Sequence, residues 1–152
     1  MIARFRFRLE ASLRLANQVL DSAQRGFAEE ARRWQACDKA CKIQQGRFHE
    51  ALEGQRDAGR HRPEELGVWQ VYTSEQRWRL RIREAERMEQ GHVLEKARHI
   101  LLEAHREVEK FRRLKERQAR DFLVTELQKE QKILDETGQI LYWRQQSQSM
   151  PS

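Results

Sequence analysis

The fold is decided by residues 9–52, LEASLRLANQVLDSAQRGFAEEARRWQACDKACKIQQGRFHEAL, because apolar side chains recur there every seven residues. One row of the repeat is Leu13, Leu20, Phe27, Trp34, Cys41 and Phe48. The second row is Leu9, Ala16, Ala23, Glu30, Cys37, Gln44 and Ala51. A repeat of 3.5 residues keeps two rows on one helical seam, which is typical of a left-handed coiled coil. Because almost every residue between the rows is polar, this helix has a narrow apolar face and needs a partner helix.

The composition indicates a protein built from long helices. Charged residues make up 36% and hydrophobic residues 38% of the 152 residues, with 7 Gly and 2 Pro. Such a chain is too polar for a thick core and too poor in helix breakers for an all-β fold. We expect one domain by length. The formal net charge of +6 permits nucleic acid, anionic lipid or an acidic protein as partner, and does not choose among them.

The sequence predicts no secretory signal, membrane span, cofactor or metal site. The first eight residues lack an apolar h-region, and no stretch approaches the roughly 20 apolar residues that span a bilayer. Cys37 and Cys41 lie four positions apart, but no second pair of Cys or His follows at zinc-finger spacing. Because both cysteines occupy seam positions, we interpret them as buried free thiols in a reducing cytoplasm.

Two helices are predicted, over about 7–54 and about 64–145, with a short disordered tail. Residues 55–62 lose the periodicity, which predicts a loop over about 55–63. Pro63 followed by two acidic residues is typical of a helix start. Arg4–Arg8, where Arg and Phe alternate, fits a short strand, a basic arm or the fraying start of the first helix, and we favour the last. One loop between two long helices predicts an all-α fold, a long antiparallel two-helix coiled-coil hairpin.

The second helix is predicted to extend beyond its partner. If the chain folds back around residues 55–63, the numbers of facing residues add to about 118, because both arms advance equally. Leu9 then lies near Glu109, and about 35 residues after Phe111 overhang. Residues 83–92 are nearly all polar, so we expect weak packing there. Alternatively, residues 64–75 form a separate tip helix, which shifts the register and shortens the overhang.

The overhang has an apolar side without an intramolecular partner, which predicts a binding surface. Its residues are Ala119, Leu123, Leu127, Leu134 and Leu141, flanked by Phe122, Ile133 and Ile140. A second apolar group, near the turn, is Trp69, Tyr72 and Trp78 with Leu80 and Ile82.

The sequence contains no recognisable catalytic motif, and we interpret the protein as a non-enzyme. It has neither a P-loop nor a G-x-G-x-x-G, and its five histidines show no H-E-x-x-H spacing. His99 and Glu103 share a helix face, which is more often a solvated pair than an acid–base couple. Two basic runs, 77–83 and 110–120, spread around the helix or alternate with acids. They favour a solvated face or a dock for an acidic protein over a nucleic-acid site.

Both ends of the chain resemble the flagellar FliJ family. Residues 5–15, FRFRLEASLRL, resemble the family's opening F-x-F-R-L-x-x-x-L-x-L. Lys115-Glu116-Arg117-Gln118, followed by Glu126, by Glu130-Gln131-Lys132 and by Asp135-Glu136, resembles its C-terminal K-E-x block with E-Q-K-x-x-D-E. The resemblance covers nearly the whole chain, and size and charge agree with it.

The resemblance implies a non-enzymatic component of the flagellar type III protein export apparatus. Members form a coiled coil similar to the central stalk of rotary ATPases. They bind and promote the export ATPase hexamer, link it to the export gate in the membrane, and handle other export chaperones. A cytoplasmic protein held peripherally at the inner membrane through the apparatus is therefore expected.

We predict two binding sites from the resemblance and from apolar exposure. The site for the export ATPase is Arg6, Arg8, Phe122, Leu123, Leu127 and Leu134. The site for the export gate is Trp69, Tyr72, Trp78 and Ile82. Three alternatives remain: an injectisome stalk protein of the same class, a basic coiled coil that binds nucleic acid, and a structural homodimer paired through its overhangs. We expect a monomer or weak dimer and no nucleic-acid partner.

Overall fold

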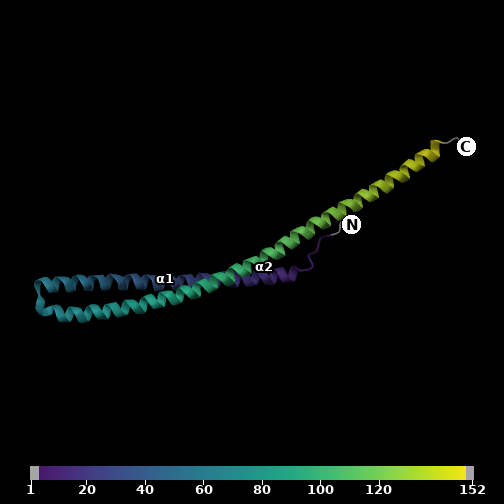
Figure 1. Ribbon diagram of the computed structural model, residues 1–152. Coiled ribbons are helices and arrows are strands. Elements are labelled where there is room, and N and C mark those ends of the chain that lie inside the picture. Colours follow the sequence, from purple (N-terminus) through teal and green to yellow (C-terminus); the bar gives the residue numbers. More distant parts are fainter. Residues whose placement is uncertain (1–3, 150–152) are drawn as a thin grey trace. The chain divides into compact units, whose positions relative to one another are not determined.

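The computed structural model describes residues 4–149, and every regular element among them is a helix. Helix α1 is Glu10–His61, a short 3₁₀ helix η1 is Pro63–Glu65, and helix α2 is Leu66–Ser149 (Figure 1). The predicted all-α hairpin with a longer second helix is thus confirmed. Since α2 is unbroken from Leu66, no separate tip helix exists over residues 64–75.

The contacts of the chain fall into two units, which we describe separately. The hairpin unit is Asn17–His105, and the terminal unit is Met1–Ala16 with Arg106–Ser152. Each unit pairs a segment of the first half of the chain with a segment of the second half. One domain was predicted from the length, whereas the contacts of the chain divide into these two units.

In the hairpin unit, the predicted seam of α1 is the face that packs on α2. From Leu20 to Ala51, every residue of the two predicted rows is buried or half-buried, and the repeat continues to the fully buried Ala58. The facing rows of α2 also follow a seven-residue repeat, Leu66, Thr73, Leu80, Arg87, Leu94 and Leu101 with Trp69, Gln76, Gln90, Ala97 and Ala104, and the second row is interrupted only at the exposed Arg83. Matching heptads on both helices keep one narrow seam in contact along the whole hairpin.

Residues 83–92 bury little, as predicted, since none of them is buried and most are exposed, but polar side chains of this stretch bond across the seam. Gln90 Nε2 donates to Glu30 Oε2 at 2.6 Å, and Arg87 donates to Asp38 at 3.3 Å. All four of these side chains are half-buried. Hydrogen bonds therefore replace apolar contacts where the sequence is polar.

Closer to the turn, three buried polar side chains extend this pattern. Gln44 Nε2 donates to Gln76 Oε1 at 2.7 Å, and Thr73 Oγ1 donates to the carbonyl oxygen of Ala51 at 3.2 Å. No buried side-chain nitrogen or oxygen among the described residues lacks a partner. Because each bond needs one particular pair of residues to face each other, these contacts help to fix the register of the hairpin.

The predicted loop over 55–63 is wrong. Helix α1 continues to His61, and only Arg62 separates it from η1. The heptad row continues through Ala51 to Ala58, and burial of Ala58 holds the helix together past Gly54 and Gly59. The turn is closed by the Arg62 amide on the Ala58 carbonyl, 2.8 Å, and by Arg62 with Asp57, 2.9 Å.

The later turn changes the register. The hydrogen-bonded pairs Gln44–Gln76 and Glu30–Gln90 each have numbers that add to 120, and Ala51–Thr73 add to 124. The predicted value of 118 is too low, because the chain reverses near residue 62 rather than 59. In the terminal unit, Lys115 therefore pairs with Glu10 at 2.9 Å, and the helix pair continues past Phe111 to Phe122.

The terminal unit begins with an irregular arm, residues 4–9, so the predicted fraying helix start is wrong. Phe7 is buried, and its carbonyl oxygen accepts the first amide of α1, from Glu10, at 3.1 Å. Phe5 packs on Phe122 with ring centroids 5.7 Å apart. The two phenylalanines of the Arg–Phe alternation, one packed on Phe122 and the other buried, thus hold the arm in place.

The C-terminal part of α2 has no partner within the described chain. Every residue of 127–149 is exposed, and α2 reaches Ser149 instead of ending near 145. The remainder of the predicted tail lies outside the described residues. No helix within residues 4–149 is both long and apolar enough to cross a membrane.

Candidate binding surfaces

The whole formal net charge of the protein lies in one part of the terminal unit. Residues 4–16 and 106–122, here called the basic collar, contain eleven of the 30 Lys and Arg residues but five of the 24 Asp and Glu residues. Their net charge is therefore +6, equal to that of the complete chain, and the remaining residues are neutral in sum. Long-range attraction of an acidic partner must therefore act mainly on the collar.

Many cations of the collar are not neutralised by a neighbouring acid. Lys115 pairs with Glu10, Lys110 with Glu107, and Glu109 with two arginines. Seven arginines make no ion pair within the described residues: Arg4, Arg6, Arg8, Arg14, Arg106, Arg117 and Arg120. Their guanidinium groups are free to bind carboxylates or phosphates.

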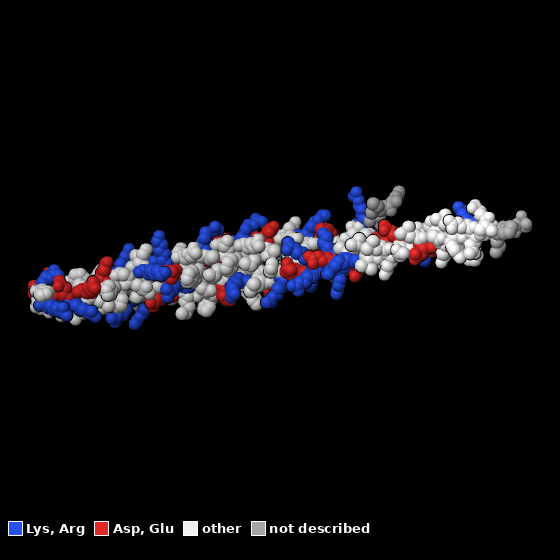
Figure 2. Space-filling model, turned by 90° about the horizontal axis from the view of Figure 1, so that it is seen from above, with Lys and Arg blue, Asp and Glu red and all other residues white. Residues whose placement is uncertain are grey.

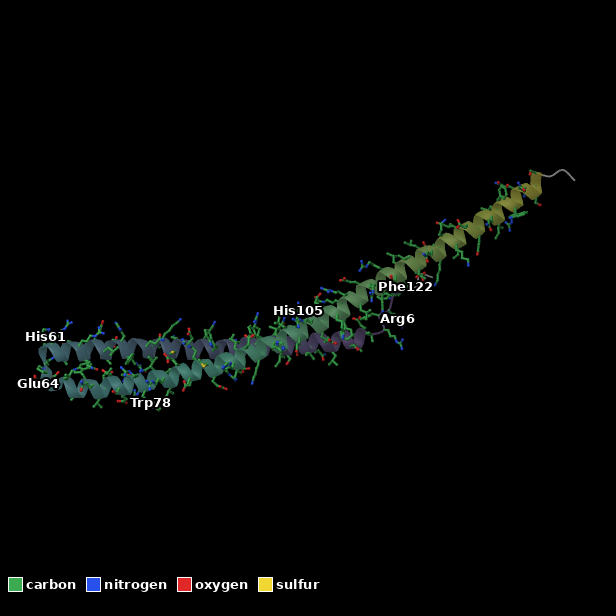
Figure 3. The ribbon with its side chains drawn as sticks, in the orientation of Figure 1. Arg6, His61, Glu64, Trp78, His105 and Phe122 are labelled. Atoms are coloured by element: carbon green, nitrogen blue, oxygen red, sulfur yellow. The ribbon has the colours of Figure 1, made fainter. Side chains whose placement is uncertain are left out.

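The structure brings part of the predicted ATPase site together. Arg6 lies near Phe122, on the arm whose Phe5 packs on Phe122 (Figure 3), while Arg8 is two residues farther along the arm and Leu123 follows Phe122 on α2. Phe122 is half-buried by Phe5 and supports the arm, whereas Leu123 is exposed. Leu127 and Leu134 are also exposed and lie farther along α2, beyond the arm.

Beyond Phe122, the apolar surface of α2 is wider than a coiled-coil seam. One row, Ile133 and Ile140, continues the heptad of Ala119, and a second row, Leu127, Leu134 and Leu141, lies about 100° farther around the helix, with Glu130 and Thr137 between the two rows. We call these two rows, with Leu123, the C-terminal face. Together the two rows span more of the helix circumference than one partner helix buries. A partner that covers both rows therefore has to be concave or built from several helices.

The predicted gate residues divide into two groups. Trp69 is half-buried in the hairpin seam, with its ring over Gly54 of α1, and Tyr72 stands edge-on against it at 5.9 Å. Trp78 and Ile82 are exposed on α2, and Trp78 projects from the hairpin (Figure 3). We call Trp78, Ile82 and the similarly exposed Val71 the outer patch. Trp69 thus packs the hairpin, while the outer patch is free for a partner.

A comparison with known protein families identifies the chain. The model of one family, described as "Flagellar FliJ protein", matches residues 5–147. The chain belongs to the FliJ family. Membership makes it a component of the flagellar export apparatus. No curated protein and no solved structure matches the chain significantly.

Several titratable groups of this FliJ-family chain form pairs along or between the helices. His99 and Glu103 lie 3.4 Å apart and are both largely exposed. The pKa of Asp38 is lowered from its ordinary value, chiefly by a hydrogen bond from Lys42; desolvation opposes this shift, and the charge of Lys42 and the contact with Arg87 add to it. Among residues 4–149, no cluster of three or more His, Cys, Asp or Glu is placed to hold a metal ion. Cys37 is half-buried and Cys41 is fully buried, both as free thiols.

The arginines of 77–83 also have local partners. Arg79 pairs with Glu75 at 2.6 Å, Arg83 pairs with Glu86 at 3.1 Å, and the Arg77 guanidinium lies 5.5 Å from the ring centroid of Phe48. Because three of its arginines have local partners, the basic run 77–83 resembles a solvated helix face rather than a phosphate-binding surface.

Sequence reasoning missed two exposed aromatic residues of the FliJ-family chain, Tyr142 and Trp143, near the end of α2. They follow Ile140 and Leu141 directly, so that four consecutive residues are apolar. Only Ile140 and Leu141 fall on the seven-residue apolar rows, so the heptad pattern does not include Tyr142 and Trp143. The signal that reveals the other two is an unbroken apolar run at the end of a helix that is otherwise polar.

Proposed function

We propose that the protein is a non-catalytic, stalk-like coiled coil that binds the flagellar export ATPase hexamer and promotes its assembly and turnover. The wide C-terminal face, left without a partner beside a collar that carries the net charge of +6, is the observation that supports this function. A ring of subunits offers a concave surface made of several elements, which a two-row apolar face needs. The basic collar would meet acidic groups at its rim.

In this proposal, ATPase activation is allosteric. Contacts that the stalk makes more favourably with one state of the ring shift the ring toward that state by the difference in binding free energy. The residues assigned to this contact are Arg6, Arg8, Leu123, Leu127 and Leu134, whereas Phe122 holds the arm in place.

The outer patch is proposed to bind the membrane export gate. Trp78 and Ile82 are large, exposed apolar side chains on an otherwise charged helix, and Trp is a common anchor residue in protein interfaces. A chain with one surface for the ATPase and another for the gate would link the two at the cytoplasmic face of the inner membrane. We also propose a role with other export chaperones, and a monomer or weak dimer when no partner is present.

The ATPase assignment is tested by the hydrolysis rate and ring assembly of the cognate export ATPase with and without the protein. We expect stimulation by the unchanged chain and loss of stimulation by Leu127→Asp with Leu134→Asp. The matched control is Gln128→Asp with Gln139→Asp, which adds the same charge to polar positions of the same exposed helix. Stimulation that survives the leucine changes would refute the assignment to the C-terminal face, provided that circular dichroism shows equal helix content.

The gate assignment is tested by binding of the isolated cytosolic domain of the gate protein. Trp78→Ala with Ile82→Ala should weaken binding without lowering the stability of the hairpin, because both side chains are exposed. Trp69→Ala should instead lower stability, because its ring packs on Gly54. Equal binding by the unchanged chain and by the outer-patch variant would exclude that patch.

A further inference from the structure

Five cations of the basic collar form one row along α2. They recur at alternating intervals of four and three residues and are Arg106, Lys110, Arg113, Arg117 and Arg120. Because successive residues of an α-helix are about 100° apart, these intervals keep all five within an arc of about 80°. The row is about 21 Å long, at about 1.5 Å per residue. We call these five residues the basic row.

The acids that alternate with the basic row in the sequence lie on other sides of the helix. By the same rotation per residue, none of Glu107, Glu109, Glu116 and Asp121 falls within the arc. All five cations of the row are exposed. Two of them have an acid nearby, Lys110 with Glu107 at 3.0 Å and Arg113 with Glu109 at 3.9 Å. Exposed pairs of this kind are weak, so the row can exchange them for other anions.

The same side of α2 becomes apolar where the basic row ends. Val124 points in the direction of the middle of the arc, with Leu127 beside it, and the two side chains are 52% and 55% exposed. Toward the C-terminal end of the chain, Figure 2 shows a surface that is largely white. One side of a single helix thus offers a row of cations followed by apolar side chains.

An anionic membrane surface matches this side of α2. Lipid phosphates are present at every point of such a surface, so each cation of the row meets one without a matched register. Cations at the edges of the arc stand only about 1 Å farther from a flat surface than those at its centre, a difference that long side chains bridge. Apolar side chains next to the cations can enter the headgroup region, as in helices that lie on membranes.

Other classes of anion fit this side of the helix less well. A single nucleic-acid strand stacks its bases on aromatic side chains, and no residue of the basic row or of its continuation to Val124 is aromatic. A nucleic acid would also leave Val124 and Leu127 in water. An acidic protein would have to present carboxylates that match the row along about 21 Å.

We propose that the basic row binds the surface of a membrane that contains anionic phospholipids, with Val124 and Leu127 entering the headgroup region. The guanidinium groups of the row bind lipid phosphates, a contact that arginine can make through two hydrogen bonds at once. This contact goes beyond the proposed function, because it needs no protein partner. Since the proposed function places the same collar at the rim of the ATPase ring, the membrane and the ATPase would bind the chain alternately.

The proposal is tested by flotation of the full-length chain with vesicles of equal parts phosphatidylglycerol and phosphatidylcholine, at physiological ionic strength. The row variant carries Arg113→Gln, Arg117→Gln and Arg120→Gln. The matched control carries Arg79→Gln, Arg81→Gln and Arg83→Gln, which remove the same charge from exposed positions of the other basic run of α2. Each cation at an anionic membrane contributes about fivefold in affinity, so the row variant should bind about 100-fold more weakly. The control should bind nearly as the unchanged chain does, and vesicles of phosphatidylcholine alone should bind none of the three.

The apolar part of the contact has its own variant, Val124→Gln with Leu127→Gln. It should bind the anionic vesicles at least about tenfold more weakly, because two apolar side chains are no longer withdrawn from water. Unchanged binding by this variant would overturn the placement of Val124 and Leu127 in the headgroup region. Circular dichroism checks that all variants keep their helix content, which Gln should preserve.

Three results would overturn the proposal. The first is a lack of binding by the unchanged chain, and the second is an equal loss in the row variant and the control, which would mean that binding follows net charge alone. The third is binding to duplex DNA that only the row variant loses, without binding to vesicles, which would assign the row to nucleic acid. None of these results bears on stimulation of the export ATPase, so the two proposals fail separately.

Discussion

Gly54 is predicted to be required because Trp69 occupies the space of a side chain there. A Cβ added to Gly54 would meet the Trp69 ring, with only 2.8 Å to Cε3. Gly46 lies in the same helix, and a Cβ added to it would meet nothing within 4 Å. The two glycines therefore form a matched pair, in which the same substitution differs only in what it contacts.

The magnitude follows from two opposing effects. Replacing Gly by Ala inside a helix stabilises it by about 1 kcal/mol, so Gly46→Ala should raise the free energy of unfolding by that amount. At Gly54 the same gain is opposed by overpacking against a large ring, which costs about 1–3 kcal/mol. Gly54→Ala should therefore be neutral or destabilising by up to about 2 kcal/mol. For a chain of this size, each kcal/mol corresponds to about 2–4 °C in Tm.

The assay is urea and thermal unfolding, followed by circular dichroism at the helix band and by Trp fluorescence. A double-mutant cycle supplies the control: in the background of Trp69→Ala, Gly54→Ala should stabilise by about 1 kcal/mol, as at Gly46. If Gly54→Ala stabilises the unchanged chain as much as Gly46→Ala does, the close packing of Trp69 on Gly54 is wrong.

Three further predictions concern polar and terminal contacts. Gln76→Leu should destabilise the hairpin by about 1 kcal/mol in urea unfolding, because Gln44 Nε2 loses its bond to Gln76 Oε1 and keeps only the 3.2 Å bond to the carbonyl oxygen of residue 76, whereas Gln44→Leu with Gln76→Leu should recover most of the loss. Asp38→Asn should lower the free energy of unfolding slightly at neutral pH, where the ionised carboxylate of Asp38 makes its contacts with Lys42 and Arg87. At pH values well below the ordinary pKa of 3.8 the substitution should have no effect, because the carboxyl group is then protonated in both the folded and the unfolded chain. Phe7→Ala should release the arm, measured as faster proteolysis at Arg8, with hairpin unfolding unchanged.

The helical hairpin was predictable because its seam obeys a strict rule. The two rows from Leu13 to Ala51 were assigned from the seven-residue repeat alone, and each of their residues is buried or half-buried. The same repeat also reaches Ala58, which indicates a helix beyond Gly54. The turn was placed too early because Gly54 and Gly59 were interpreted as breakers, although one of them makes room for an indole ring.

Other features depend on pairs of residues that no single segment of sequence reveals. Gln44 and Gln76 are polar residues at seam positions, and only the fold shows that they satisfy each other. The arm was wrongly assigned to a helix. The contact that holds it, Phe5 on Phe122, joins residues more than 100 positions apart, so the local sequence does not reveal it. Among the site residues, Leu127 and Leu134 were correctly expected to be exposed, while Trp69 was assigned to a partner although it packs within the hairpin.

The contrast between the two ends of α2 explains how one helix can serve both stability and binding. From Leu66 to Phe122 its seam is covered by earlier parts of the chain, and this packing supplies the free energy that keeps the hairpin folded. Beyond Phe122, only local contacts support the helix, such as Glu126 with Lys129 at 3.5 Å and Gln131 with Asp135 at 3.1 Å.

Local contacts of this kind contribute about 0.2–0.5 kcal/mol each, which leaves an isolated helix marginally stable in water. Burial of Leu127, Leu134 and Leu141 by a partner would add far more, at roughly 1.5–3 kcal/mol for each large apolar side chain. Helix stability in residues 123–149 and binding are therefore coupled: each requires apolar burial that the chain does not provide for itself. A partner that covers this segment must stabilise its helix as it binds, while the hairpin, whose seam is already filled, stays unchanged.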